Sequence, residues 1–164
     1  MQKKETPNFY QQRDYKVLPP DAVDNASAEK YWPSTPPMID TLINSVVAVP
    51  ADNETVTVPS SGEVEVKGYA VPQGADGPLT RVEVSADKGE SWIDADLNGS
   101  SRDSKWSWVL WTATMKLPPG TGREIWSRAT DAGGNTQKQH SQWNLRGLGY
   151  CGYGRARNLT VVES

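Results

Sequence analysis

The sequence predicts an all-β protein, a sandwich of antiparallel strands preceded by an extended N-terminal arm. From Asn44 onward, short β-rich runs are interrupted by Gly, Pro, Asn or Asp about every ten residues, a pattern typical of β-sandwiches. Before Asn44, the apolar residues follow no sustained period. Because 164 residues fit one domain plus a tail, we divide the chain into an arm at 1–44 and a sandwich at 45–164.

The arm is expected to be extended because it is rich in proline, at positions 7, 19, 20, 33, 36 and 37. Each proline removes a backbone donor and restricts the residue before it. One helical exception is expected at 24–30, where Asp24 or Asn25 can cap a segment that contains two alanines.

The first three expected strands follow the arm. Runs at 45–49 and 55–58 stop at Pro50 and Pro59, which cannot donate to a central ladder. Between 63 and 70, valine, glycine and alanine alternate with charged residues and tyrosine. This period of two predicts a strand with one buried and one exposed face.

A hairpin is expected next. Residues 81–85 alternate in the same way, and the turn at 87–90 returns the chain into 91–93. Within this turn, Gly89 occupies a position suited to positive φ.

Four further segments complete the sandwich. Strands are expected at 106–115, 124–129, 142–148 and 155–162, and the segment 131–135 is interpreted as a tight turn that ends one of them. The total of seven to nine strands is enough for an immunoglobulin-like sandwich.

The strand at 106–115 is the most apolar, and both of its faces are aromatic. A period of two places Trp106, Trp108 and Leu110 on one face and Val109 and Trp111 on the other. One sandwich core covers one face, so the second needs a partner surface. We therefore expect Trp106, Trp108 and Trp111 to form core and interface contacts, which we favour over a platform that stacks sugars.

Composition excludes several classes of function. The net charge of −3 argues against sequence-independent binding of nucleic acid, and no run of about 18 apolar residues is present to span a membrane. No apolar stretch of a secretory signal follows the first residues. A soluble, intracellular protein is therefore expected.

Few residues suggest catalysis or metal binding. The chain lacks the common phosphate-loop, zinc and nucleophile motifs. His140 lies in a polar loop without a second ligand beside it, so a solvated side chain is expected. Cys151 is alone, which excludes an internal disulfide and favours a small buried side chain. We expect no metal site.

Two residues are better candidates. Arg146 alternates with the apolar Leu145 and precedes Gly147, which would allow a ligand to approach the backbone. Its guanidinium suits an oxyanion, although an arginine in solvent is the plainer interpretation. Tyr15 is a phenol among charged residues and carries little information alone.

Six motifs in order resemble the C-terminal region of eukaryotic sulfite oxidases and nitrate reductases, and they extend from about Phe9 to Arg157. They are Arg13-Asp14-Tyr15-Lys16-Val17-Leu18-Pro19-Pro20, Asn44-Ser45-Val46-Val47, Val66-Lys67-Gly68-Tyr69-Ala70, Arg81-Val82-Glu83-Val84-Ser85, Gly89-Glu90-Ser91-Trp92 and Trp143-Asn144-Leu145-Arg146-Gly147. The resemblance implies an immunoglobulin-like (E-set type) dimerisation domain, hence a homodimer, beside a molybdopterin-binding domain whose last residues the arm resembles.

The resemblance also implies roles for the two candidates. Tyr15 would line a substrate pocket as a catalytic residue, and Arg146 would bind the oxyanion in the same pocket. Because related nitrate reductases usually carry Met at the position of Arg146, sulfite oxidation to sulfate by oxo transfer is favoured over nitrate reduction. After Gly147, the glycine-rich segment Gly149 to Gly154 departs from the family's usual pattern.

The molybdenum ligand and its cofactor lie in the larger domain of the family, so this chain is expected to hold no cofactor and to be inactive alone. The compartment is expected to be cytosolic or mitochondrial. Two alternatives remain: the same domain of a nitrate reductase, or a free-standing immunoglobulin-like module that binds carbohydrate through exposed tryptophans.

Overall fold

The computed structural model describes residues 7–99 and 103–164, so residues 1–6 of the predicted arm lie outside the described residues. Three short helical segments are present: a π-helical turn at Tyr10–Asp14, helix α1 at Asn25–Ala28 and a 3-10 turn at Gly74–Asp76. The strands are β1 (Asn44–Val49), β2 (Thr55–Val58), β3 (Glu63–Val71), β4 (Leu79–Ser85), β5 (Ile93–Asp94), β6 (Asp96–Asn98), β7 (Val109–Lys116), β8 (Gly120–Asp131) and β9 (Gly154–Glu163).

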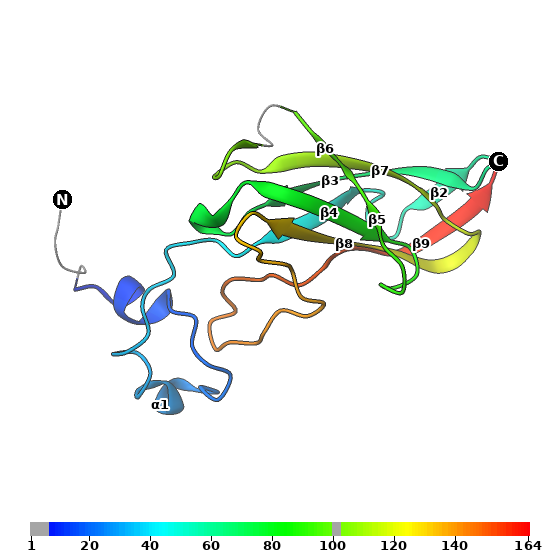
Figure 1. Ribbon diagram of the computed structural model, residues 1–164. Coiled ribbons are helices and arrows are strands. Elements are labelled where there is room, and N and C mark those ends of the chain that lie inside the picture. Colours follow the sequence, from blue (N-terminus) through cyan, green and yellow to red (C-terminus); the bar gives the residue numbers. More distant parts are fainter. Residues whose placement is uncertain (1–6, 100–102) are drawn as a thin grey trace.

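These strands form the predicted sandwich (Figure 1). Sheet A has the order β1-β3-β7-β6, and sheet B has the order β2-β9-β8-β4-β5. Strand pairing is antiparallel with one correction, because β2 runs parallel to β9. The all-β prediction is confirmed, whereas the strictly antiparallel arrangement is not.

The core lies between the two sheets and consists of their inward-facing alternate residues. Val66, Ala70, Val109 and Trp111 face it from sheet A, and Val82, Val84, Ile125, Ala129 and Leu159 face it from sheet B. A Cβ at Gly68 would lie 2.2 Å from the ring of Trp111. Only glycine therefore leaves room for this ring at the centre of the core.

The predicted strand at 142–148 is absent, and a loop occupies its place. The side chain of Asn144 closes this loop on itself: its Oδ1 accepts from Leu148 N at 3.0 Å, and its Nδ2 donates to Leu148 O at 2.8 Å. Alternation alone suggested a strand, but here local hydrogen bonds of an asparagine replace a ladder.

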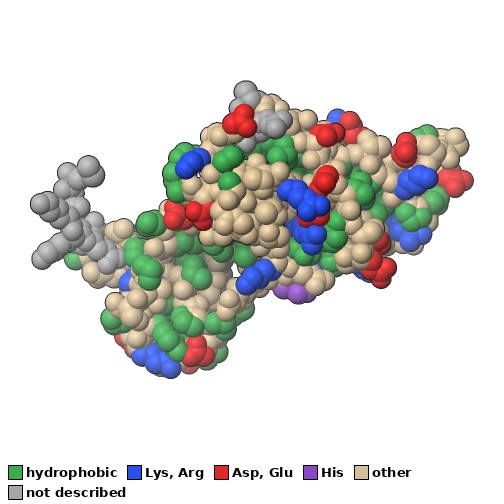
Figure 2. All heavy atoms as spheres, viewed as in Figure 1, with side chains coloured by type: hydrophobic (Ala, Val, Ile, Leu, Met, Phe, Trp, Pro, Cys, Tyr) green, Lys and Arg blue, Asp and Glu red, His purple; other side chains and the backbone are tan. Residues whose placement is uncertain are grey.

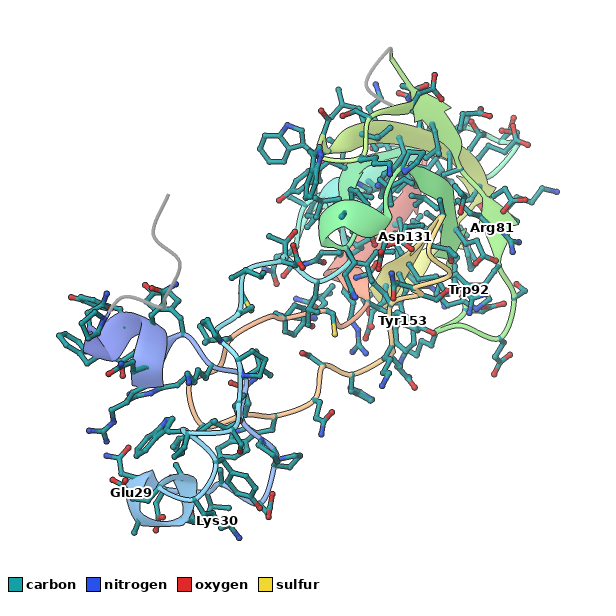
Figure 3. All side chains as sticks on the ribbon, turned by 60° about the vertical axis from the view of Figure 1, so that its left-hand side comes forward. Glu29, Lys30, Arg81, Trp92, Asp131 and Tyr153 are labelled. Atoms are coloured by element: carbon teal, nitrogen blue, oxygen red, sulfur yellow. The ribbon has the colours of Figure 1, made fainter. Side chains whose placement is uncertain are left out.

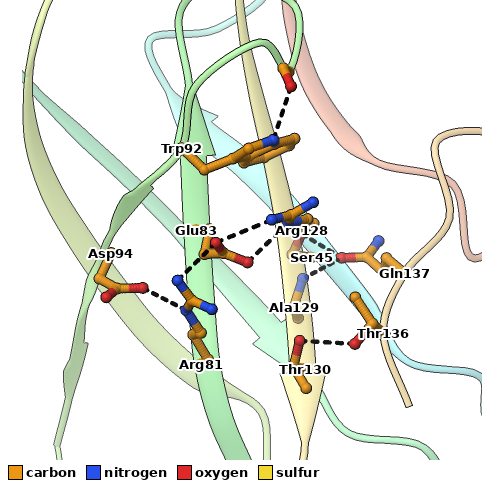
Figure 4. Close-up of polar contacts among 11 residues, drawn as sticks. Ser45, Arg81, Glu83, Trp92, Asp94, Arg128, Ala129, Thr130, Thr136 and Gln137 are labelled. Atoms are coloured by element: carbon orange, nitrogen blue, oxygen red, sulfur yellow. Dashed lines mark hydrogen bonds and ion pairs between the residues drawn. The ribbon is translucent and has the colours of Figure 1, made fainter. Parts of the chain in front are cut away.

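The long connection between β8 and β9, residues 132–153, is anchored by Gln137 (Figure 4). Its Oε1 accepts from Ser45 Oγ at 2.6 Å and from Ala129 N at 2.9 Å. Its Nε2 donates to Asn44 Oδ1 at 3.2 Å and to Gly152 O at 2.7 Å. A fully bonded, buried amide thus fixes the base of this connection to both sheets.

The arm has a small core of its own, which sequence analysis did not predict. Four buried residues form it, and one residue of the 132–153 connection packs against it: Leu18, Ala22, Ala28 and Trp32, with Leu145. The predicted helical turn is confirmed as α1, which Asp24 caps by accepting from Ser27 N at 2.7 Å. Figure 1 shows the arm and the connection side by side at one end of the sandwich.

The outer face of sheet B carries a dense polar network (Figure 4). The buried carboxylate of Glu83 accepts from Arg128 at 2.8 and 3.0 Å and from Arg81 at 2.8 Å. Arg81 also donates to Asp94 at 2.6 Å. Figure 2 shows the resulting mixture of basic and acidic side chains over β4 and β5.

Across the described ranges, no helix is long and apolar enough to cross a membrane.

Candidate functional site

A tight turn in the 132–153 connection carries Arg146. Gly147 donates its N–H to Asn144 O at 2.9 Å and adopts a φ of +63°, a conformation that favours glycine. A Cβ added at Gly147 would meet nothing within 4 Å. The glycine is therefore required by the backbone conformation of the turn, whereas the sequence had suggested close approach to a ligand.

Arg146 forms an ion pair with the arm. Its Nη2 lies 2.5 Å from Asp14 Oδ1, and the two side chains are 34% and 29% exposed. Packing of Leu145 on the arm's small core brings the turn to this position. Asp14 could not be predicted as a partner, because 132 positions separate the two residues along the chain.

Tyr15 follows Asp14 and is half exposed. Its N–H donates to Tyr10 O at 2.8 Å, and its carbonyl accepts from Met38 N at 2.7 Å, so its backbone is fixed from both sides. The two residues singled out from the sequence, Arg146 and Tyr15, thus lie on either side of Asp14 in one region of the molecule.

An open cleft of about 510 Å³ surrounds Arg146. Nine residues of the 132–153 connection line it, with Trp143 and Tyr150 both more than half exposed: Ser141, Gln142, Trp143, Asn144, Leu145, Arg146, Gly147, Leu148 and Tyr150. A guanidinium has five N–H donors, so Arg146 can contact an anion while it stays bound to Asp14.

Neither His140 nor Cys151 forms a metal site. His140 is exposed, as predicted, and Cys151 is half-buried with its Sγ 3.9 Å from Ser141 Oγ. Within 7–99 and 103–164, no group of three or more His, Cys, Asp or Glu side chains could hold a metal ion. Arg146 lines the cleft described above, whereas Tyr15 is not among the residues that line it.

A second candidate surface lies on the outer face of sheet A, which we call the aromatic face and define as Val46, Tyr69, Trp106, Trp108 and Leu110. Trp106, Trp108 and Leu110 are 68%, 67% and 64% exposed. Trp108 packs edge-on against Tyr69 with ring centroids 5.4 Å apart. The alternation of residues 63–70 had placed Tyr69 on this face without assigning it a role.

Trp111 does not fit the expected interface position. It is fully buried in the chain's own core, against Gly68. The pleat that exposes Leu110 turns Trp111 inward, so Trp111 cannot contact a partner surface. Trp106 and Trp108 precede β7, which begins at Val109, three residues later than predicted.

Comparison with known proteins identifies relatives that match most of this chain. The sequence model of the Mo-co oxidoreductase dimerisation domain matches residues 36–157. A sulfite oxidase of Arabidopsis thaliana is 34% identical over 156 residues, which cover 88% of this chain and 37% of that protein. A nitrate reductase [NAD(P)H] of Hordeum vulgare is also 34% identical, over 88% of this chain and 17% of that protein.

Two further similarities extend this result. Human mitochondrial sulfite oxidase is 35% identical over 90% of this chain and 27% of its own length. Among solved structures, the sulfane dehydrogenase SoxCD of Paracoccus pantotrophus superposes with a TM-score of 0.66 at 20% identity, over 97% of this chain and 40% of that one. The chain therefore spans less than half the length of each of these four relatives.

Proposed function

The chain belongs to the Mo-co oxidoreductase dimerisation domain family, and from this membership we propose that it forms a homodimer through its aromatic face. The supporting observation is the exposure of three large apolar side chains on one side of sheet A. Two of them, Trp106 and Trp108, border a hollow of about 500 Å³ together with Tyr69. Such patches on a single chain usually mark protein interfaces, where aromatic residues carry much of the binding energy.

This proposal is tested by light scattering over a concentration series. The wild-type chain is expected to have twice the mass of one chain. Replacing Trp106 and Trp108 together by serine is expected to weaken the dimer by about 3 kcal/mol, roughly a hundredfold in Kd. Trp143→Ser removes another exposed tryptophan, from the 132–153 connection, and serves as the control. A dimer that survives the double substitution would place the interface elsewhere.

We further propose that, in an intact enzyme, this chain lies beside a molybdopterin-binding domain and contributes Arg146 and Tyr15 to an oxyanion pocket. The molybdenum cofactor would supply the oxygen-atom transfer. The guanidinium of Arg146 would neutralise part of the oxyanion's charge, and the hydroxyl of Tyr15 would donate a hydrogen bond or hold a proton. Among the described residues, none is assigned as a ligand of the metal.

The ion pair between Asp14 and Arg146 supports this arrangement. It holds the guanidinium beside the segment that carries Tyr15 and leaves most of its donors free. Because Asp14 neutralises one positive charge, the site would bind a small anion without retaining it too tightly. Asp14 is therefore a positioning residue in this proposal.

Sulfite is the favoured substrate because Arg146 stands where related nitrate reductases usually carry Met. Nitrate is the alternative, since relatives of both kinds are equally similar to this chain. The test is the activity of the enzyme that contains this chain together with its cofactor domain. Arg146→Gln is expected to raise the KM for sulfite by about tenfold or more, as loss of a hydrogen bond to a charged group predicts. Arg157→Gln, an exposed arginine on β9, is the control. Nitrate turnover without sulfite turnover would reverse the assignment.

A further inference from the structure

The arm contains a buried lysine without an acidic partner. Lys16 is only 4% exposed, and its Nζ donates to the backbone oxygen of Trp32 at 2.7 Å. Within the described part of the chain, no carboxylate pairs with it: the arm's carboxylates that form ion pairs, Asp14, Asp21 and Glu29, bind Arg146, Lys30 and Arg13. An ammonium group has three donors, so two remain for another acceptor. Burial of an unpaired charge is costly unless something else compensates it.

A cavity of about 320 Å³ lies next to this lysine, lined by Gln12, Lys16, Trp32 and Pro33. The indole N–H of Trp32 is buried and has no acceptor. The lining thus includes an amide and an ammonium, both of which can donate hydrogen bonds, and the buried indole N–H without an acceptor belongs to a residue of the same lining.

A second cation stands over the same tryptophan. The guanidinium carbon of Arg13 lies 4.0 Å from the centroid of the Trp32 ring. Its acidic neighbour Glu29 is 4.0 Å away and 71% exposed, so this pair is weak. Figure 3 places Glu29 and Lys30 at the tip of the arm, remote from the sandwich residues Arg81 and Trp92. Two cations, Lys16 and Arg13, thus contact Trp32, the first through its backbone oxygen and the second over its ring.

We propose that this cavity is a binding site for a small dianionic oxyanion of the sulfate and phosphate type, held by Lys16 and Gln12, with the guanidinium of Arg13 on the Trp32 ring adding positive charge nearby. Donors arranged around a hollow suit an anion that presents acceptor oxygens in several directions. A carboxylate offers two oxygens in one plane and would satisfy fewer of them. The site uses residues of the arm alone and does not include Arg146. Its test is therefore independent of the proposed dimer and of the proposed substrate pocket.

The probe is sodium sulfate, added to the full chain at constant ionic strength adjusted with sodium chloride. The readout is the indole N–H signal of Trp32 in a ¹H–¹⁵N spectrum, assigned with a Trp32→Phe variant. A saturable shift of this signal is expected. Because sulfate also strengthens apolar burial generally, a local and saturable shift separates binding from salting out.

Lys16→Met keeps the length of the side chain and removes its charge, and it is expected to weaken the apparent affinity for sulfate about tenfold or more. Lys30→Met is the matched control, since it removes a charge from an exposed lysine of the same arm, and it is expected to change the affinity less than about twofold. Arg13→Gln, at a half-exposed side chain, is the second variant if Lys16→Met disturbs the arm.

Three results would overturn the proposal: no saturable shift with sulfate in the wild-type chain, equal affinity in wild type and both variants, or saturation by acetate without saturation by sulfate. The last result would identify a carboxylate site.

Discussion

Both outer faces of the sandwich carry tryptophans, which are exposed on sheet A and covered by cationic side chains of the same chain on sheet B. On sheet A, Trp106 and Trp108 are about two-thirds exposed. On sheet B, Trp92 and Trp126 lie under cations: Arg128 is 4.1 Å from the ring centroid of the first, and Arg155 is 4.3 Å from that of the second.

The polar atoms of the sheet B rings are also satisfied within the chain. Trp92 Nε1 donates to Gly89 O at 3.0 Å, and Trp126 Nε1 donates to Glu124 Oε2 at 2.7 Å. Tyr153 stands edge-on to Trp92 with centroids 5.2 Å apart. Aromatic content alone therefore does not identify an interface. Exposed rings that lack partners in their own chain do.

The largest expected effect on stability comes from removing Glu83, the centre of the sheet B network. Glu83→Ala leaves two arginines around a nearly buried site, and we expect it to lower the free energy of unfolding by about 2–3 kcal/mol. Urea unfolding measures the change. Glu65→Ala removes a carboxylate from an exposed pair with Lys67 and should cost below about 0.5 kcal/mol. Equal effects would show that the network contributes no more than a surface pair.

Replacing one tryptophan on each face tests separately which face contributes to stability and which to self-association. Trp92→Ala removes a cation–π contact, a ring contact and a hydrogen bond, so the free energy of unfolding should fall by about 1–2 kcal/mol while self-association stays unchanged. Trp108→Ala should do the reverse. Urea unfolding at low protein concentration and sedimentation velocity distinguish the two outcomes. Loss of self-association in Trp92→Ala would show that the interface lies on sheet B and not on sheet A.

The smallest expected effect concerns the turn that positions Trp92. Hydrogen bonds from Ser91 and Ser85 lower the pKa of Asp87 from 3.8 to about 2. A lowered folded-state pKa adds stability above the unfolded-state value, and this contribution is lost as pH falls from about 4 to about 2. Asp87→Asn should therefore be slightly less stable than wild type at neutral pH, and the difference should vanish near pH 2. A urea-midpoint difference that stays constant with pH would contradict this assignment.

Much of the sandwich could be predicted because its signals are local. The alternation at 63–70 placed Val66, Gly68 and Ala70 inward, and the turn at 87–90 has Gly89 at a φ of +89°, as expected. The same alternation gave a false strand at 142–148, since a period of two does not reveal that Asn144 bonds within its own loop.

The candidate site was only half visible for a different reason. Arg146 and Tyr15 were found through motifs, but Asp14 as a partner and the buried state of Lys16 depend on contacts across the fold. Trp111 was predicted to share in the interface from the face opposite Trp106 and Trp108, but that face is covered by the chain's own core, where Trp111 is fully buried. Residue types indicated which side chains could bind an anion or form an interface, but their burial and their partners depend on the folded structure.

The dependence of the arm on Leu145 and Arg146 has a consequence for biosynthesis. Within this chain, the arm is synthesised before Leu145, the residue of the connection that packs against its small core, which follows more than a hundred positions later. Since synthesis proceeds at about 5–20 residues per second, the arm spends seconds without its cover. Released chains truncated before residue 141 should therefore be cleaved by a protease within the arm, while the full chain should resist cleavage there. The arm is made before the sandwich, and its core is completed only after most of the sandwich has been synthesised.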